Sequence, residues 1–319
     1  MTPTAAEAAA FAVPVISLRS GADDVVLAQE IRGACEGAGF FYLSEHGVSE
    51  ALVARAFEWS AKLFDLPLEE KSNCRWTLNN YSRGWTPLME ETLDPKNSSA
   101  ADTKEGFYIG REMPPTRRFH GPNQWPTPAS CPSWTQHDCD EFRAVMTEYW
   151  TVCETLGKRV VRLLAYAVAS DFSSFDAYTK QPMVFLRLLH YTGIKSEASE
   201  GRFACGAHSD YGLLTFLRTD DEPGLQILSK QGEWCDVPPR PGMFIVNIGD
   251  LVEVISQGRF RSTTHRVLNK TGRERYSIPV FFEPDADAPI ARDAQGNVIT
   301  AIQYLQLKYE QTHADFQAL

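Results

Sequence analysis

The sequence has no excess of basic residues and no long hydrophobic run. Its 319 residues include 31 Lys and Arg against 41 Asp and Glu, and the formal net charge is −10. A broad surface for DNA or RNA needs clustered cations, so this acidic balance argues against a nucleic-acid partner. No segment approaches the roughly 18 apolar residues of a membrane span. We therefore expect a small-molecule partner, no nucleic-acid binding and no membrane insertion.

Paired cysteines and a secretory signal are also missing. The seven cysteines are an odd number and form no C-x-x-C pair, which argues against a disulfide framework or a zinc knuckle. Residues 1–12 contain neither a basic segment nor a long apolar one, so they do not resemble a signal peptide. These absences predict free thiols and a cytoplasmic location.

Residues 1–135 predict short strands and helices, followed by a long stretch without periodicity. Apolar runs at 13–17 and 39–43 are typical of strands, and helical spacing covers 24–38 and 49–64. Residues 72–135 are rich in Pro, Asn, Thr and Trp and lack a clear pattern. Such long irregular stretches are often lids or binding loops, and we expect that role here.

Residues 136–319 predict one long helix, a β-rich region and a C-terminal helix. Apolar residues recur on one stripe from 138 to 168, and helical spacing returns at 302–316. Between these helices, short apolar runs are separated by Gly, Pro and Asn, which is typical of an antiparallel sandwich or barrel. The runs lie at 184–191, 213–217, 225–228, 243–248, 264–268 and 276–282. Because no linker separates the two regions, we expect an α+β fold that forms one compact unit.

Two histidines and an aspartate in the β-rich region have the pattern of a metal site. His208 and Asp210 are two residues apart, so in an extended strand their side chains point to the same face. A barrel of short strands would return His265 to the same mouth. Two His and one carboxylate on one face of an octahedral ion leave three positions open, as in non-haem Fe(II) oxygenases. Taken alone, the pattern is weak, because a surface His, a loop Asp and an unrelated core His would also produce it.

A second pair of polar residues follows His265 on the last predicted strand. Strand alternation places Arg275 and Ser277 on one face. The planar guanidinium and the hydroxyl together suit a carboxylate, which they would hold by charge-assisted hydrogen bonds. The alternative is a solvated charge at a strand edge, since Arg273 and Glu274 precede the pair. Together with the metal pattern, the pair predicts an anion site beside an ion.

Ordered motifs along nearly the whole chain resemble one family. They include Gly39-Phe-Phe-Tyr-Leu-Ser-Glu-His-Gly47, His208-Ser-Asp-Tyr-Gly-Leu-Leu-Thr215, Ser262-Thr-Thr-His-Arg-Val267 and Arg275-Tyr-Ser-Ile278, with further matches at 13–17, 64–71, 186–191, 224–227, 237–242 and 246–250. The chain is similar to the Fe(II)- and 2-oxoglutarate-dependent dioxygenases of the soluble plant and microbial type, the group of isopenicillin N synthase. Residues 103–111 resemble a segment of the thymine-hydroxylase-like branch.

The resemblance implies a double-stranded β-helix (jelly-roll) core with flanking N-terminal helices and a C-terminal helix. It implies that His208, Asp210 and His265 bind Fe(II) and that 2-oxoglutarate and O2 are co-substrates. 2-Oxoglutarate would chelate the iron through its keto and C1 carboxylate oxygens. Arg275 and Ser277 would hold its far carboxylate.

A third group of expected co-substrate contacts lies on the strand at 184–191. Tyr191 matches a family tyrosine that contacts 2-oxoglutarate, and alternation places Arg187 on the same face as a second anion contact. The family often has an asparagine where this chain has Leu189, so we do not expect that contact here. His190 alternates to the opposite face and is expected to be structural or at the surface.

The activity that the resemblance implies is oxidation, most directly hydroxylation, of a small organic metabolite with release of succinate and CO2. Asp210 excludes halogenation, because halogenating members have a small residue at that position. Expected substrate contacts are Tyr108 and Arg111, in the segment that resembles the thymine-hydroxylase-like branch, and Phe281, on the face of Arg275. For each of the three, a structural role is the alternative.

Two other functions fit the same residues. An iron-dependent oxidase that does not use 2-oxoglutarate, like isopenicillin N synthase, also keeps an Arg-x-Ser pair. A jelly-roll binding module without turnover is the second alternative, although it would have no need of all three metal ligands. The sequence leaves open the identity of the substrate and the oligomeric state.

Overall fold

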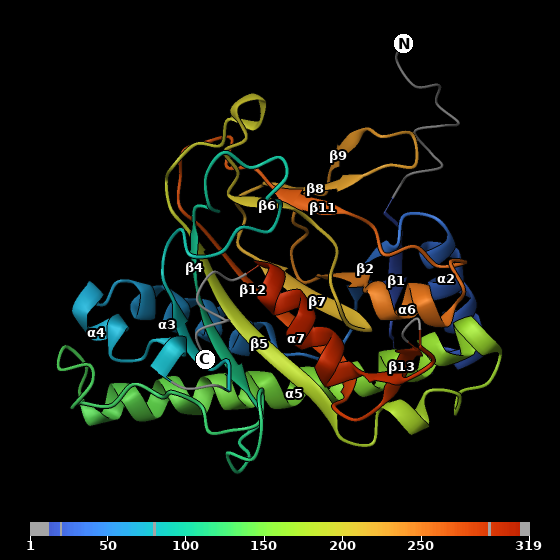
Figure 1. The fold of residues 1–319 in the computed structure, drawn as a ribbon, viewed down its shortest axis with the longest axis horizontal. Helices are drawn as coiled ribbons and strands as arrows, with labels where there is room; N and C mark the ends of the chain where they lie inside the picture. Colours follow the sequence, from blue (N-terminus) through green and yellow to red (C-terminus); the bar gives the residue numbers. More distant parts are fainter. Residues whose placement is uncertain (1–12, 20, 79–80, 293–294, 313–319) are drawn as a thin grey trace.

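The computed structural model describes residues 13–19, 21–78, 81–292 and 295–312, and two facing β-sheets form its centre (Figure 1). Within these residues the larger sheet has eight strands, in the order β1–β2–β10–β7–β12–β5–β4–β3. Their bounds are Val15–Ser17 (β1), Phe40–Ser44 (β2), Phe244–Ile248 (β10), Leu214–Thr219 (β7), Arg275–Asp285 (β12), Pro182–Tyr191 (β5), Lys104–Gly110 (β4) and Gly84–Thr86 (β3). The smaller sheet contains Cys205–His208 (β6), His265–Val267 (β11), Leu225–Leu228 (β8) and Trp234–Asp236 (β9).

The helices flank this core, which confirms the predicted α+β jelly-roll class. They are Asp24–Glu36 (α2), Glu50–Phe64 (α3), Leu68–Ser72 (α4), Gln136–Ala169 (α5), Asp250–Ile255 (α6) and Ala301–Thr312 (α7), with 3-10 turns at Trp76–Leu78, Asp176–Tyr178 and Ala198–Glu200. A small hairpin pairs Pro289–Arg292 (β13) with Val298–Thr300 (β14). The last residues of the predicted C-terminal helix, 313–316, lie outside the described residues.

The long helix α5 runs beneath the larger sheet (Figure 1). It begins at a capping box, in which Thr135 accepts from the backbone N–H of Asp138 and Asp138 accepts from that of Thr135. Trp150 donates from its indole to the carbonyl of Val184 on β5 at 3.1 Å. Apolar side chains on one stripe of α5 are buried against the sheet, so this face of the sheet is closed and the polar groups gather on the other.

Residues 72–135 contain more regular structure than predicted, because strands β3 and β4 lie in this stretch. All seven residues of β4 are buried, and the strand pairs with both β3 and β5. The charged residues Lys104 and Glu105 broke the apolar pattern in the sequence. They are buried here because each is paired with oppositely charged side chains, a compensation that local sequence does not show.

Strands from both predicted regions share the larger sheet, with β1 to β4 at its two ends and β5, β7, β10 and β12 between them. No helix in the described part of the chain is long and apolar enough to cross a membrane. All seven cysteines are free, as predicted.

Candidate active site

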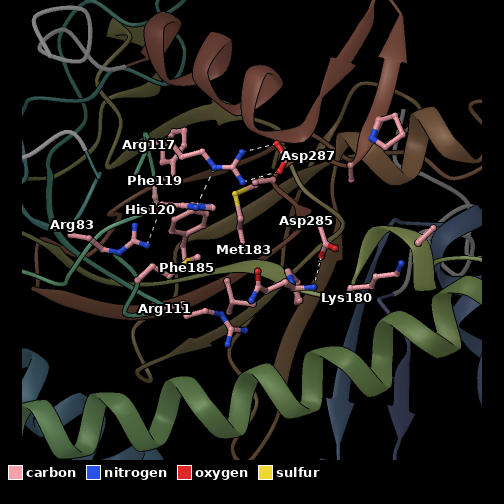
Figure 2. Close-up of a pocket in the computed structure, with 18 residues that line it drawn as sticks. Arg83, Arg111, Arg117, Phe119, His120, Lys180, Met183, Phe185, Asp285 and Asp287 are labelled. Atoms are coloured by element: carbon pink, nitrogen blue, oxygen red, sulfur yellow. Dashed lines mark hydrogen bonds and ion pairs between the residues drawn. The ribbon is translucent and has the colours of Figure 1, made fainter. Parts of the chain in front are cut away.

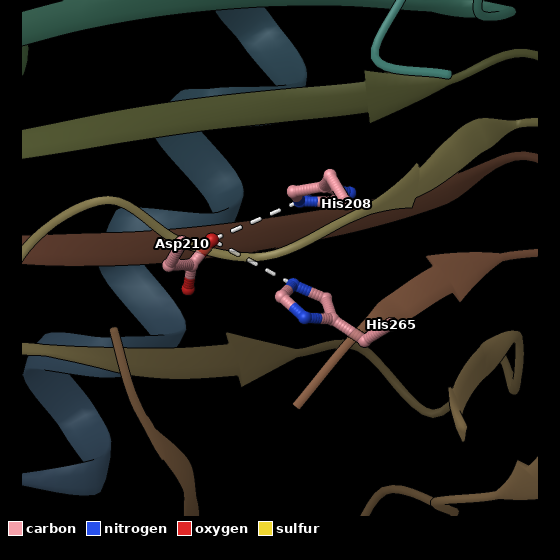
Figure 3. Close-up of side chains that lie close together, drawn as sticks. All are labelled: His208, Asp210 and His265. Atoms are coloured by element: carbon pink, nitrogen blue, oxygen red, sulfur yellow. Dashed lines mark ion pairs between the residues drawn. The ribbon is translucent and has the colours of Figure 1, made fainter. Parts of the chain in front are cut away.

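The three predicted metal ligands converge at the mouth of a cavity between the two sheets (Figure 3). His208 ends β6 and His265 begins β11, and the two are paired across these strands. Their Nε2 atoms lie 3.7 and 3.6 Å from Oδ1 of Asp210. One donor atom from each residue lies within 4.8 Å of the other two, so a single ion could contact all three. Asp210 lies just beyond the end of β6, so a loop rather than strand alternation directs it to the ion.

Backbone carbonyl groups hold both imidazole rings. Nδ1 of His208 lies 2.8 Å from the carbonyl oxygen of Gly206. Nδ1 of His265 lies 3.1 Å from the carbonyl oxygen of Thr263. A carbonyl oxygen only accepts, so each Nδ1 carries the proton and each Nε2 keeps its lone pair for a metal. Burial and the neighbouring His208 lower the pKa of His265 to about 4. A neutral ring is the form that binds a metal ion.

The carboxylate of Asp210 is anchored by its other oxygen. Oδ2 accepts hydrogen bonds from Thr215 Oγ1 at 2.5 Å and from Asn247 Nδ2 at 2.7 Å. Burial by itself would raise the pKa of Asp210, but the two histidines and these hydrogen bonds lower it overall. Thr215 and Asn247 were not predicted as site residues, although both lie in quoted motifs. Two neutral imidazoles and one ionised carboxylate form a donor set that suits Fe(II).

Arg275 and Ser277 lie on the wall of the same cavity, opposite Tyr191 and Leu189 of β5. Arg275 Nε donates to the carbonyl of Glu222 at 3.2 Å, whereas Nη1 is buried and has no hydrogen-bond partner in the described part of the chain. Cζ of Arg275 lies 4.8 Å from the centre of the Tyr191 ring, and Tyr191 and Ser277 line the same cavity. A buried guanidinium with an unused donor, beside two hydroxyls, fits a carboxylate ligand.

Four buried charged residues form a cluster at the side of this cavity. Glu91 pairs with Arg187 at 3.1 Å and with Lys104 at 2.9 Å, and Lys104 also pairs with Asp102 at 2.5 Å. Asp102 in turn accepts from the backbone N–H of Gly206, two residues before His208. Arg187 faces the cavity, as alternation predicts, but it is already paired with Glu91. Glu91, Asp102 and Lys104 lie in the stretch without periodicity, where no sequence signal marked them.

A second cavity adjoins the first and shares His208, Asp210, Arg187 and Phe281 with it. Tyr108 and Phe281, both predicted to contact substrate, lie on its wall. The cavity is also lined by Glu91, Leu93, Phe185, Ser209, Tyr211, Glu283, Leu305 and Tyr309. Leu305 and Tyr309 belong to α7, so the C-terminal helix closes one side of this cavity. Tyr211, Glu283 and Tyr309 were not predicted as site residues.

Arg111 lies in a different pocket, which is lined by none of the metal ligands (Figure 2). Its guanidinium pairs with Glu154 of α5, and its Cζ lies 5.2 Å from the centre of the Trp150 ring. The same pocket contains Arg117, which pairs with Asp287. The structure thus brings Tyr108 and Phe281 to the metal site but connects Arg111 to the long helix.

His190 has structural contacts, as predicted, and so does His46. His190 Nδ1 lies 2.9 Å from Glu105, and its ring stacks on Tyr276 with centroids 4.7 Å apart. His46 Nε2 lies 3.1 Å from the carbonyl oxygen of Gly242. Neither residue lines the cavities at the metal site.

A jelly-roll core with a two-histidine, one-carboxylate site and an arginine-lined cavity defines a class of non-haem iron oxygenases. The chain matches the model of the non-haem dioxygenase in morphine synthesis N-terminal family over residues 13–128, and that of the 2OG-Fe(II) oxygenase superfamily over residues 184–284. The 2-oxoglutarate-Fe(II) type oxidoreductase hxnY of Emericella nidulans is 37% identical over 276 residues, which cover 84% of this chain and 76% of hxnY. Homoarginine-6-hydroxylase from Arabidopsis thaliana is 34% identical over 284 residues, covering 84% of this chain and 81% of the relative.

Solved structures agree with this similarity. A full-length Neurospora crassa protein in complex with alpha-KG (2-oxoglutarate) and thymine superposes with a TM-score of 0.80 at 28% identity, covering 95% of this chain and 98% of that one. JOX2 in complex with 2OG, Fe and JA superposes with a TM-score of 0.73 at 28% identity, covering 92% and 84%.

The chain belongs to the Fe(II)- and 2-oxoglutarate-dependent dioxygenase family. It is an oxidoreductase whose cofactor is Fe(II) and whose co-substrates are 2-oxoglutarate and O2. These relatives favour neither of the alternatives drawn from the sequence, an oxidase without 2-oxoglutarate or a binding module without turnover.

Proposed function

We propose that the enzyme hydroxylates a small organic molecule, with Fe(II) on His208, Asp210 and His265 and the far carboxylate of 2-oxoglutarate on Arg275 and Ser277. The observation that carries the assignment is the buried Nη1 of Arg275, which lacks an acceptor among the described residues. A buried donor without a partner costs on the order of 1–3 kcal/mol, and a bound carboxylate removes that cost.

The overall reaction converts R–H, 2-oxoglutarate and O2 into R–OH, succinate and CO2. Bound Fe(II) supplies the redox chemistry that couples decarboxylation of 2-oxoglutarate to oxidation of a C–H bond. The chain positions the reactants: His208, Asp210 and His265 would hold the ion at the cavity and leave coordination positions for the reactants. Leu189 and Val267 line the cavity between the ligands and Arg275, and these apolar side chains keep water from the co-substrate.

Tyr191 and Arg187 have different roles in this proposal. Tyr191 packs on Arg275 and lines the same cavity as Ser277, so it fixes the orientation of the anchor and contacts the co-substrate. Arg187 lines both cavities, with its Cζ 4.4 Å from the centre of the Tyr108 ring. Because Glu91 neutralises much of its charge, we assign Arg187 to the boundary between co-substrate and substrate.

The adjoining cavity, with Tyr108 and Phe281 on its wall, is the proposed substrate site. Seven of the thirteen residues that line it are aromatic or apolar and six are polar or charged, a mixture that can hold and orient a small molecule. The relatives support this class, since one is named a homoarginine hydroxylase and two structures hold thymine or JA. Glu91 and Leu93 from the stretch 72–135 line the cavity, which supports a lid role for that part of the stretch. The retained carboxylate of Asp210 supports hydroxylation over halogenation.

Two measurements test the proposal. Anaerobic addition of 2-oxoglutarate to the Fe(II)-loaded protein is expected to produce a weak metal-to-ligand absorption band in the visible range. A metabolite screen scored by succinate release then identifies the substrate. If no band forms when both Fe(II) and 2-oxoglutarate are present, the assignment of the two sites is wrong.

A further inference from the structure

Glu283 is a buried acidic residue whose Oε2 has no hydrogen-bond partner among the described residues. It lies near the end of β12, is 4% exposed and lines the proposed substrate cavity together with His208 and Asp210. Its Oε2 is fully buried. Buried carboxyl groups in folded proteins are almost always paired or hydrogen-bonded, so an unpaired one on a cavity wall indicates a site for a ligand.

The strand itself explains why Glu283 faces the cavity. Alternate residues of β12 point to one face, and Arg275, Ser277, Phe281 and Glu283 are all in phase. The first three line the co-substrate cavity, and Phe281 and Glu283 line the adjoining one. Eight residues of strand span roughly 26 Å, so Arg275 and Glu283 mark opposite ends of the combined site.

Among the described residues, no cation is paired with Glu283. Its carboxyl group packs against Gly212, where a Cβ atom would lie 2.3 Å from Oε2. Burial, and after it the charges of Asp210 and Asp250, raise the pKa of Glu283 to about 8, so the carboxyl group is largely protonated at neutral pH and a cationic ligand would stabilise its ionised form. Arg187, the cation of this cavity, is already bound to Glu91.

Aromatic rings line the rest of the cavity. The rings of Tyr108 and Tyr309 lie with their centroids 6.3 Å apart. Tyr211 and Phe281 complete an aromatic wall beside the metal ligands. Such walls suit a flat molecule, and ring faces attract a positively charged one.

We propose that Glu283 selects the substrate by accepting hydrogen bonds from an N–H group, so that the substrate is a small nitrogenous molecule held between aromatic rings. An amidinium, guanidinium or ammonium group, or a neutral amide or heterocyclic N–H, supplies this chemistry. The inference rests on the proposed function, because it places the substrate beside the proposed iron ligands.

Three probes of similar size and shape test the inference. Benzamidine carries a cationic N–H group, benzamide a neutral one, and acetophenone has only an acceptor. Their binding is measured by anaerobic calorimetry on the enzyme loaded with Fe(II) and 2-oxoglutarate. We expect benzamidine or benzamide to bind at least about tenfold more tightly than acetophenone, which is about 1.4 kcal/mol. Preference for benzamidine identifies a cationic substrate, and preference for benzamide identifies a neutral one.

The variant Glu283→Ala is expected to abolish the N–H preference, whereas Glu283→Gln keeps a carbonyl acceptor and should lose only a preference for the cationic benzamidine. Glu58→Gln, at an exposed glutamate of α3, is the matched control and should keep the preference. Since Glu283 Oε2 has no hydrogen-bond partner among the described residues, replacement by Gln should leave the thermal midpoint unchanged or raised. Equal binding of acetophenone, no binding of any probe at millimolar concentration, a preference that survives in Glu283→Ala, or a lowered midpoint in Glu283→Gln would each overturn the inference.

The absorption band of the Fe(II)–2-oxoglutarate complex separates this inference from the proposed function. If the band forms in wild type and in both Glu283 variants but the N–H preference is absent, only the substrate inference fails. If the band does not form in wild type, the proposed function fails as well.

Discussion

Each proposed metal ligand is held through the atom that does not face the ion. The carbonyls of Gly206 and Thr263 fix the imidazoles of His208 and His265. Asn247 and Thr215 fix the carboxylate of Asp210. These contacts set the direction of the lone pairs before an ion binds, and ligands oriented in advance raise metal affinity.

Replacing Asn247 with Ala is therefore expected to weaken Fe(II) binding about 10- to 100-fold, the usual effect of removing a partner of a metal ligand. The reason is the loss of the 2.7 Å hydrogen bond to Asp210 Oδ2. Anaerobic Fe(II) titration measures the change. The exposed Asn97, replaced with Ala in the same way, should leave the affinity unchanged. Equal affinities in wild type and Asn247→Ala would show that Asn247 does not orient the ligand.

Arg275, the proposed anchor for 2-oxoglutarate, has a matched control in Arg273, which lies two residues earlier in the sequence. Arg275→Ala is expected to weaken 2-oxoglutarate binding on the order of 100-fold, since losing one partner of a buried charge pair costs about 2–5 kcal/mol. Arg273→Ala removes an exposed arginine that pairs with Glu222, and should have little effect. The dependence of the visible band on 2-oxoglutarate concentration gives both values. Unchanged affinity in Arg275→Ala would reject its assigned role.

At the scale of elements, strand β12 connects the whole site. Its cavity face contains Arg275, Ser277, Phe281 and Glu283, and its other face packs on α5. The contact with α5 is close because Gly157 lies against the ring of Phe282, where a Cβ would be 2.4 Å from the nearest ring carbon. The position of this strand on the helix thus sets the position of the residues in the cavity.

Two glycine-to-alanine changes separate helix propensity from packing. Alanine in a helix is favoured over glycine by about 1 kcal/mol, so Gly33→Ala in α2, where a Cβ would meet no atom within 4 Å, should stabilise the protein. In Gly157→Ala the collision with Phe282 should outweigh that gain and lower the free energy of unfolding by about 1–3 kcal/mol. Chemical denaturation measures both changes. A stabilised Gly157→Ala would mean that α5 and β12 can separate without cost.

At the scale of the molecule, the two sheets enclose a set of buried ionisable groups in a chain of net charge −10. The cluster of Glu91, Asp102, Lys104 and Arg187 balances its own charge. The metal ligands and Glu283 do not balance their charges in this way, so their burial costs folding free energy. Bound iron would offset this cost at the metal ligands, and in our inference a nitrogenous substrate would offset it at Glu283. Sites that are strained or unpaired without their ligands are common where binding is the function.

This arrangement predicts how the metal-free protein responds to acid. The pKa of His265 is 6.5 in an unfolded chain and about 4 when folded, so between these values the unfolded state binds more protons. Stability should therefore be complete above pH 6.5 and fall as the pH drops towards 4, by on the order of 3 kcal/mol from this group. Denaturation in the presence of a chelator measures it. His265→Asn should show a smaller loss over the same range, and an unchanged loss would exclude His265 as the cause.

Much of the fold and the site followed from local patterns. The six predicted strands and the two predicted helices of the C-terminal half lie near their observed bounds, because apolar periodicity reports which face of an element is buried. Strands β6, β9, β13 and β14 and helix α6 were not predicted. His208, Asp210, His265, Arg275 and Ser277 line one cavity, although Asp210 reaches it from the loop after β6 rather than by strand alternation. Strands β3 and β4 were missed, and in β4 the charged residues are buried in pairs that form between distant segments.

What the sequence determined by itself is the chemistry: His208-x-Asp210 and Arg275-x-Ser277 are short-range patterns of residue type, and His265 lies in a motif that resembles the family. Tertiary structure alone decided which groups lack partners and what surrounds them. Only the packed sheets show that Nη1 of Arg275 and the carboxylate of Glu283 are left without protein partners in the described part of the chain, and that Arg111 is directed to α5. The physical reason is that burial and pairing depend on contacts between segments far apart in the chain, which no local pattern records.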